Sequence, residues 1–217
     1  MGISATEVKQ LRDKTGAGFM DCKSALAEAS GDVEQAITIL RKRGIAKAEK
    51  RSGRSTSEGV VGSYIHMGGK VGVLVEVGCE SDFVARTDEF QQLVREVAMH
   101  IAAANPQVVT RDEVPEADVE REKVIFRAQF ESSNKPAEVV DKIVDGKMNS
   151  YYQQVVLLDQ PSIRDPKTSV QDLVTAAIAK MGENITISRF ARFKICLLYT
   201  SDAADEGLGV DLGGRRI

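Results

Sequence analysis

The sequence predicts an α+β protein with an N-terminal three-helix domain, followed by a small antiparallel sheet covered by helices. Two observations carry this prediction. Apolar residues recur at helical spacing through the first 44 residues, and from Val60 the spacing changes to the two-residue period of a strand. The order along the chain is then helices, a hairpin, more helices and one late strand, so strands distant in sequence must share one sheet.

Composition limits the classes of protein. The 217 residues are 42% hydrophobic and 5% aromatic, with no Trp, which is typical of one medium or two small domains with an aliphatic core. A net charge of −3 argues against a surface that binds nucleic acid throughout. The three Cys are far apart, which fits a reducing cytoplasm. No apolar run reaches the ~20 residues that span a bilayer, and the charged N-terminus is unlike a secretory signal, so we expect a cytoplasmic protein.

Residues 1–44 are predicted to form three short helices. Ser4 with Glu7, and Asp32 with Gln35, have the pattern of helix N-caps. Helices this short are unstable alone and must pack together. Gly44 is expected to end the third helix. The apolar faces are Val8 and Leu11, then Phe19, Cys22, Leu26 and Ala29, then Val33, Ala36, Ile37 and Leu40.

Residues 45–58 are predicted to be a basic linker, because they contain too few apolar side chains for a core. One interpretation is a solvated tether that is helical at first and then flexible. The other is direct contact with an acidic partner or RNA. The basic side chains here and just before are Lys42, Arg43, Lys47, Lys50, Arg51 and Arg54.

Residues 59–195 are predicted to be the α+β core. Residues 60–67 and 70–77 are β-rich runs joined by Gly68-Gly69, the pattern of a hairpin, and alternate valines of the second run line one face. Thr87 is expected to cap an amphipathic helix that Asn105-Pro106 ends. Further helices are predicted at 116–133, from Pro136, at 148–158 and at 170–181, before a strand at 185–188 that gives the hairpin a third partner.

Three segments in register resemble the elongation factor Ts family. They are Thr-Gly-Ala-Gly-Phe-Met-Asp-Cys-Lys-Ser-Ala-Leu at 15–26, Val-Glu-Val-Gly-Cys-Glu-Ser-Asp-Phe-Val-Ala-Arg at 75–86, and Gly-Glu-Asn-Ile at 182–185. Each is weak alone, but their order and spacing match the family across residues 4–194. Ser81 departs from the family's usual Thr and keeps the β-hydroxyl.

The resemblance implies a ubiquitin-associated-like N-terminal domain and the short family form with one core module. It implies a non-enzymatic guanine-nucleotide exchange factor that binds the GTPase elongation factor Tu in its GDP state, disturbs its Mg²⁺ site and promotes GDP release during translation. No cofactor, metal, membrane or direct nucleic-acid partner is expected. Some short members act as homodimers, so a homodimer is one expectation; Ala191 excludes a covalent dimer through that position.

The expected partner-binding residues follow from the same resemblance. Ser81, Asp82, Phe83 and Val84 connect the second strand to the Thr87 helix, and the resemblance implies that the Phe83 ring enters the GTPase near its Mg²⁺. The alternatives are a core role for Phe83 and a capping role for Asp82. In the N-terminal domain, the resemblance implies docking on the GTPase through a surface near the four residues named below. For the two apolar ones, Phe19 and Met20, a role in the core of the domain is equally open. These four are Lys9, Arg12, Phe19 and Met20.

No constellation for catalysis is present: there is no GxxxxGK[ST] loop and no HExxH, and His66 and His100 are expected to be ordinary structural residues. The competing hypothesis is a nucleic-acid-binding protein that uses basic residues 41–54, although interleaved aromatic side chains are missing there.

The segment at 196–217 has no counterpart in the family. It looks like the translation of a transposase-type sequencing adapter, from Cys196 through the outer arm that ends at Ile217. We therefore interpret it as an adapter or assembly scar and exclude it from functional reasoning.

Overall fold

The computed structural model describes residues 3–130 and 136–195, and the adapter-like segment lies outside them. These residues form an α+β fold, which confirms the predicted class. The helices are α1 (Ala5–Thr15), α2 (Phe19–Glu28), α3 (Val33–Glu49), α4 (Asp82–Ala85), α5 (Asp88–Ala104), α6 (Glu116–Ala128), α7 (Ala137–Val155) and α8 (Val170–Met181), with short 3-10 turns η1 (Arg111–Glu113) and η2 (Leu157–Asp159); the strands are β1 (Glu58–Ile65), β2 (Val71–Cys79) and β3 (Ile185–Lys194).

Helices α1, α2 and α3 pack around a small core of their own. Ser4 and Glu7 form the predicted capping box before α1, and the Asp32 carboxylate accepts hydrogen bonds from two backbone N–H groups at the start of α3. The predicted apolar faces meet in this core, with one exception: Phe19 lies outside it and is 46% exposed. The buried members are Val8, Leu11, Cys22, Ala25, Leu26, Ala29 and Ala36.

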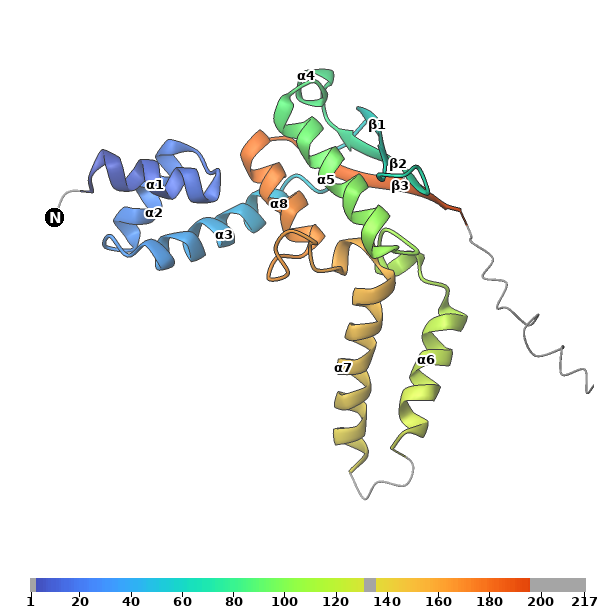
Figure 1. The fold of residues 1–217 in the computed structure, drawn as a ribbon. Coiled ribbons are helices and arrows are strands. Elements are labelled where there is room, and N and C mark those ends of the chain that lie inside the picture. The colour runs from blue at the N-terminus through green and yellow to red at the C-terminus, as the bar shows by residue number, and fades with distance from the viewer. Residues whose placement is uncertain (1–2, 131–135, 196–217) are drawn as a thin grey trace, which may run out of the picture.

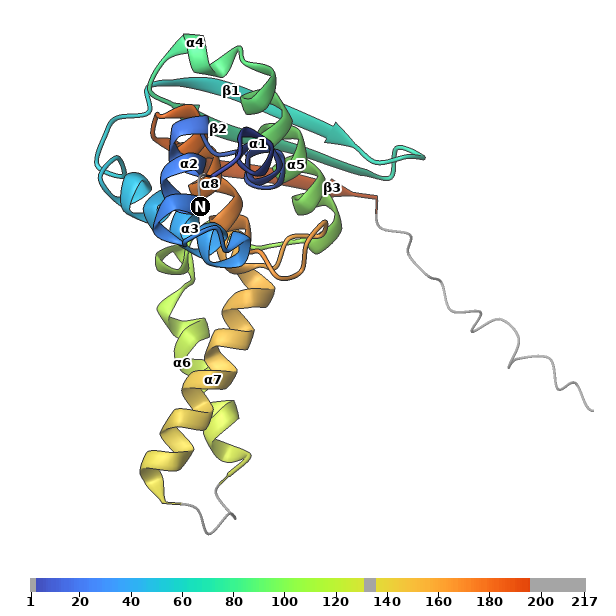
Figure 2. The same cartoon turned by 90° about the vertical axis from the view of Figure 1, so that its left-hand side faces the viewer.

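The prediction that Gly44 ends the third helix is wrong, since α3 continues to Glu49. Gly44 instead lies where α3 meets α8, and a Cβ built on it would be 3.5 Å from the Cβ of Ala179. The absent side chain thus allows two helices to approach closely. Arg41 pairs with Asp172 of α8 at 3.0 Å across the same contact. Figure 1 shows α3 running from α1 and α2 towards α8, and the view in Figure 2, turned by 90°, has these N-terminal helices in front of α8.

The segment predicted as a linker is therefore helical in its first five residues. Ala48 near the end of α3 is buried in the core beneath the sheet, which the thin apolar content of this stretch did not suggest. Three of the basic side chains have carboxylate partners within the chain: Arg43 with Glu28, Lys47 with Asp21, and Arg54 with Glu80.

The three strands form one antiparallel sheet in the order β1-β2-β3. The hairpin of β1 and β2 is as predicted, and Gly68 and Gly69 both adopt the positive φ that the turn requires. Val73, Val75 and Val77 of β2 point to the buried face. Helices α5 and α8 cover that face (Figure 1), while the other face carries no described helix.

Strand β3 pairs with β2 as predicted, but it extends to Lys194 rather than ending at 188. The register shifts between Glu76 and Val77, so that Ser188 is an extra residue on β3. A bulge of this kind reverses which positions face the core. Ile185 and Ile187 face inwards before it, and Phe190 does so after it, so a search for strict alternation ends at 188.

Helices α6 and α7 form a hairpin that projects from the rest of the molecule (Figure 1). The sequence predicted a separate helix at 148–158; α7 is instead one helix from Ala137 to Val155. Its apolar stripe includes the buried Val144 and Met148 and continues past Gly146, which is exposed. Packing against α6 outweighs the cost of about 1 kcal/mol for a glycine inside a helix.

Candidate functional site

The segment between β2 and α5 forms the one-turn helix α4. The Ser81 hydroxyl accepts a hydrogen bond from the Val84 backbone N–H at 3.4 Å and so caps α4. Thr87 caps the start of α5 and also donates from its hydroxyl to the Val84 carbonyl at 2.8 Å. Both ends of α4 are therefore fixed by side-chain caps.

Phe83 projects from this short helix with 88% of its surface exposed. Its neighbours in the turn point the other way, since Ala85 is buried and Val84 packs against the main core. A fully buried Phe contributes roughly 1.5–3 kcal/mol of hydrophobic stabilisation, and Phe83 gains little of this. The alternative that Phe83 is a core aromatic is therefore wrong; Phe90, in the first turn of α5, has that role at 0% exposed.

Asp82 is the first residue of α4, and the capping alternative considered for it is wrong because Ser81 provides the cap. The Asp82 carboxylate instead pairs with Arg86 one turn later, with oxygen-to-nitrogen distances of 2.5 and 3.2 Å. Both side chains are more than half exposed, so the pair contributes at most a few tenths of a kcal/mol. Asp82 therefore remains accessible to a donor on a partner.

The turn before α4 is bound to the turn between α8 and β3. The Glu183 carboxylate accepts from the Ser81 backbone N–H at 3.0 Å and from the Ser81 hydroxyl at 2.6 Å. In the opposite direction, the Glu80 carboxylate accepts from the Asn184 backbone N–H at 2.6 Å. This hydrogen bond is the main reason that the pKa of Glu80 lies below its ordinary value, since it stabilises the ionised form. Two turns 102 residues or more apart are thus joined reciprocally.

The buried Asn184 side chain extends this connection to the turn that follows α3. Its Nδ2 donates to the Arg54 carbonyl at 2.8 Å and to the Ser52 carbonyl at 3.4 Å. Cys79 lies at the base of the α4 turn, where its thiol donates to the Ser81 carbonyl at 3.2 Å. Burial, and next the nearby Glu183 charge, raise the pKa of Cys79, so the thiol keeps the proton that it donates.

All four candidate residues of the N-terminal module are exposed. Lys9 and Arg12 are one turn apart on α1, and Met20, in the first turn of α2, is 70% exposed. The alternative that Phe19 and Met20 form the module's core is therefore wrong. The module thus presents two cations and two large apolar side chains to solvent.

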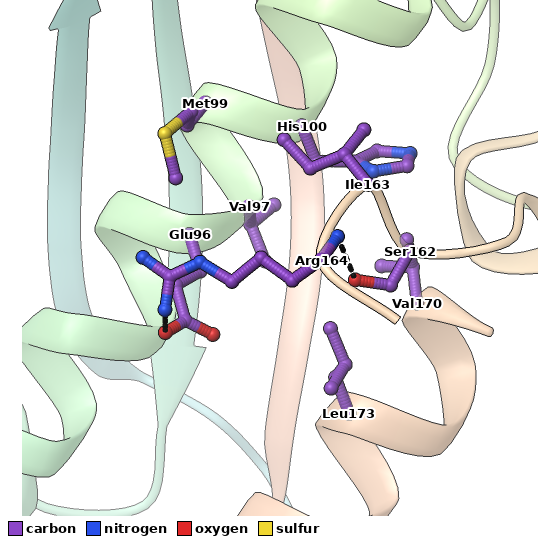
Figure 3. Close-up of a pocket in the computed structure, with 9 residues that line it drawn as sticks. All are labelled: Glu96, Val97, Met99, His100, Ser162, Ile163, Arg164, Val170 and Leu173. Atoms are coloured by element: carbon purple, nitrogen blue, oxygen red, sulfur yellow. Dashed lines mark hydrogen bonds and ion pairs between the residues drawn. The ribbon is translucent and has the colours of Figure 1, made fainter. Parts of the chain in front are cut away.

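Other parts of the described chain offer no comparable site. A depression between α5 and α8 (Figure 3) has a volume of about 10 Å³, room for roughly one water molecule. His100 lies there, 3% exposed, with its Nε2 2.9 Å from Gln160 Oε1, and burial lowers its pKa. Within residues 3–130 and 136–195, no group of three His, Cys, Asp or Glu could hold a metal, and no helix is long and apolar enough to cross a membrane.

Comparison with known proteins decides the family. The sequence model of the family described as "Elongation factor TS" matches residues 4–195. The chain is 56% identical over 195 residues to elongation factor Ts of Fervidobacterium nodosum, covering 90% of this chain and 99% of that protein. The chain belongs to the elongation factor Ts family.

Two further elongation factor Ts proteins support this. That of Koribacter versatilis is 57% identical over 195 residues, 90% of this chain and 89% of its own length. That of Caldanaerobacter subterraneus is 55% identical over 192 residues, 88% and 96% of the two chains. Membership of this family makes the chain a translation elongation factor with a general role in nucleotide exchange on elongation factor Tu.

Two of the three segments that carry the elongation factor Ts resemblance lie together in the structure, since the turns at 80–84 and 182–185 are hydrogen-bonded to one another. Sequence reasoning assigned no role to Glu80, Glu183 or Asn184. Their presence inside the matching segments was the available signal. The hydrogen-bond partners of Glu80, Glu183 and Asn184 depend on how the sheet places two distant turns beside one another. The spacing of residues in the sequence does not predict this placement.

Proposed function

We propose that this chain releases GDP from elongation factor Tu by inserting Phe83 near the Mg²⁺ of the GTPase and disturbing its coordination. The observation that carries the proposal is the Phe83 ring, 88% exposed on a one-turn helix that is capped at both ends. Large aromatic side chains held rigidly at a surface are the usual centres of binding energy in protein interfaces.

An exchange factor needs no reactive group of its own. It accelerates release by binding the nucleotide-free GTPase more tightly than the GDP-bound form. Bound GDP then lowers the affinity of the GTPase for the exchange protein by the same ratio as the exchange protein lowers the affinity for GDP. A ring that occupies space near the metal only after the nucleotide loosens has this differential affinity. Asp82 and Val84 flank the ring, with the Asp82 carboxylate accessible for a polar contact and Val84 anchoring the turn to the core. Ser81 acts within the chain, as the cap of the turn.

The N-terminal helices provide a second contact in this proposal, as a ubiquitin-associated-like domain that docks on the GTPase. Lys9 and Arg12 offer charge, and Phe19 and Met20 offer apolar surface. Two linked contacts raise the effective concentration of the second once the first has formed. The direct contact between α3 and α8 limits how freely the two contacts move relative to one another.

The test is the rate of GDP release from elongation factor Tu, with and without the protein, at millimolar Mg²⁺ and after chelation of Mg²⁺. We expect strong acceleration with Mg²⁺ present and little further acceleration once the ion has been removed, because the disturbed interaction is then already absent. Equal acceleration in both conditions would refute the Mg²⁺ step but leave exchange intact. No acceleration in either would refute the function.

We also propose that a second copy of the chain covers the bare face of the sheet. On that face each of the three strands exposes at least one large apolar side chain, and a two-fold axis can place this patch against the same patch of a second copy. A Leu74→Lys variant should then be monomeric by sedimentation at concentrations where the parent protein is dimeric. A monomeric parent protein would refute the proposal. The exposed apolar residues are Val61, Ile65, Leu74 and Phe193.

A further inference from the structure

Glu183 binds both donors of the residue that caps the Phe83 turn. It lies between Gly182, which ends α8, and the start of β3, and its two carboxylate oxygens separately accept from the Ser81 N–H and hydroxyl. The 2.6 Å distance to the hydroxyl oxygen is in the range of charge-assisted hydrogen bonds, which are roughly twice as strong as neutral ones.

This contact determines what the Ser81 hydroxyl can do. A hydroxyl has one proton to donate and lone pairs to accept with. With the proton given to Glu183, the lone pairs are left for the Val84 N–H, which is the capping bond of α4. The orientation of the Ser81 cap is therefore set by Glu183.

Helix α4 depends on this support because it has only four residues. A single helical turn is unstable alone, since the cost of fixing its backbone is not offset by its few internal hydrogen bonds. Its order comes from its neighbours: the cap at Ser81, the packing of Val84 and the burial of Ala85. The Phe83 side chain is mostly exposed and is not held by core packing as Val84 and Ala85 are, so the direction of its ring follows the direction of the turn.

The second half of the connection holds Glu183 in place. Asn184, the next residue, donates its backbone N–H to Glu80 and its side-chain N–H groups to the carbonyls of Ser52 and Arg54. Asn184 is 2% exposed, so these polar atoms have no alternative partner in solvent. The turn that carries Glu183 is thus bound on both sides.

We propose that Glu183 is a positioning residue for nucleotide exchange, which holds Phe83 in the orientation that enters the GTPase. This inference rests on the proposed function of Phe83. Glu183 acts through Ser81 and α4 and makes no contact with the partner in this role.

The exchange experiment compares Glu183→Gln, Phe83→Ala and the double variant, with Glu89→Gln as the matched control. Gln cannot accept from both Ser81 donors through two oxygens, whereas Glu89 lies on α5 and pairs with Lys180 at 3.6 Å, a long distance for an ion pair. We expect Glu183→Gln to lower kcat/KM for GDP release about tenfold or more, because a hydrogen bond to a charged group is worth at least that factor. We expect no further loss in the double variant, and no change in the control.

A spectroscopic experiment separates positioning from a general effect on stability. The chain contains no Trp, so Phe83→Trp places a single tryptophan on α4, whose emission is excited selectively beyond the absorption of the four Tyr. Well below the unfolding temperature, Glu183→Gln should lower the fluorescence anisotropy of Trp at position 83 while the circular dichroism stays the same. Ser81→Ala, which removes the cap of α4 together with its hydrogen bond to Glu183, should lower the anisotropy at least as much.

The outcomes are distinct. A lower unfolding temperature with unchanged anisotropy would overturn the positioning role, as would an additional loss of exchange on top of Phe83→Ala. If Phe83→Ala itself leaves exchange unchanged, the proposed function fails, and the anisotropy still decides whether Glu183 orders α4.

Discussion

Replacing Gly44 tests whether the N-terminal helices pack on the rest of the molecule through α3. A Cβ at position 44 would lie 3.5 Å from the Ala179 Cβ of α8, an ordinary van der Waals distance. Gly44→Ala therefore fits, and it should stabilise the protein by up to ~1 kcal/mol, because alanine is the better helix former. Gly44→Leu places more carbons against α8 and should lose ~1–3 kcal/mol through overpacking.

Gly146 provides the matched control, since it lies inside α7 with no atom within 4 Å of a built Cβ. Both Gly146→Ala and Gly146→Leu should be stabilising. For a chain of this size, 1 kcal/mol corresponds to about 2–4 °C in Tm, which thermal unfolding followed by circular dichroism resolves. If Gly44→Leu raises Tm as much as Gly146→Leu, then α3 and α8 are not in contact in solution, and the helical packing between the two parts of the chain is refuted.

Three other predictions follow from burial and charge. Phe90→Ala should destabilise by ~3–5 kcal/mol and Phe83→Ala by under ~1 kcal/mol in thermal unfolding, and equal losses would contradict their assigned environments. Burial depresses the pKa of His100 below its ordinary value of 6.5, so the unfolded chain binds more protons than the folded chain just below that pH. The free energy of unfolding should therefore fall as the pH drops below about 6.5. A His66→Gln variant leaves His100 as the remaining histidine, so that its NMR signal can be titrated directly. Limited trypsin digestion should cut first between Lys50 and Arg54 rather than at Lys47, which is inside α3 and paired with Asp21, and early cleavage within residues 60–110 would show that the domain boundary is misplaced.

The elements with strong local signals were predictable from the sequence. The hairpin has alternating valines and a two-glycine turn, and α5 has both its Thr87 cap and its Asn105 end. Errors arose where tertiary packing overrides a local signal. Gly44 has the local character of a helix end, but it lies inside α3, where the missing side chain allows α8 to approach closely. Gly146 is tolerated inside α7 because the opposite side of that helix is packed.

The candidate site was predictable only in part. The position of Phe83 came from the resemblance to the family, and its exposure came from the structure. The second half of β3 was missed because the bulge at Ser188 reverses the alternation of buried positions. The Glu183 contact was not predictable from spacing, because it joins residues 102 positions apart through the geometry of the sheet.

The most direct test of the account is the kcat/KM of Phe83→Ala for GDP release from elongation factor Tu, measured beside the thermal unfolding of the same variant. An aromatic interface residue of this kind is worth ~2 kcal/mol or more, so we predict a loss of roughly 30-fold or greater in a protein whose Tm is nearly unchanged. A well-folded Phe83→Ala protein with undiminished exchange would contradict the central claim.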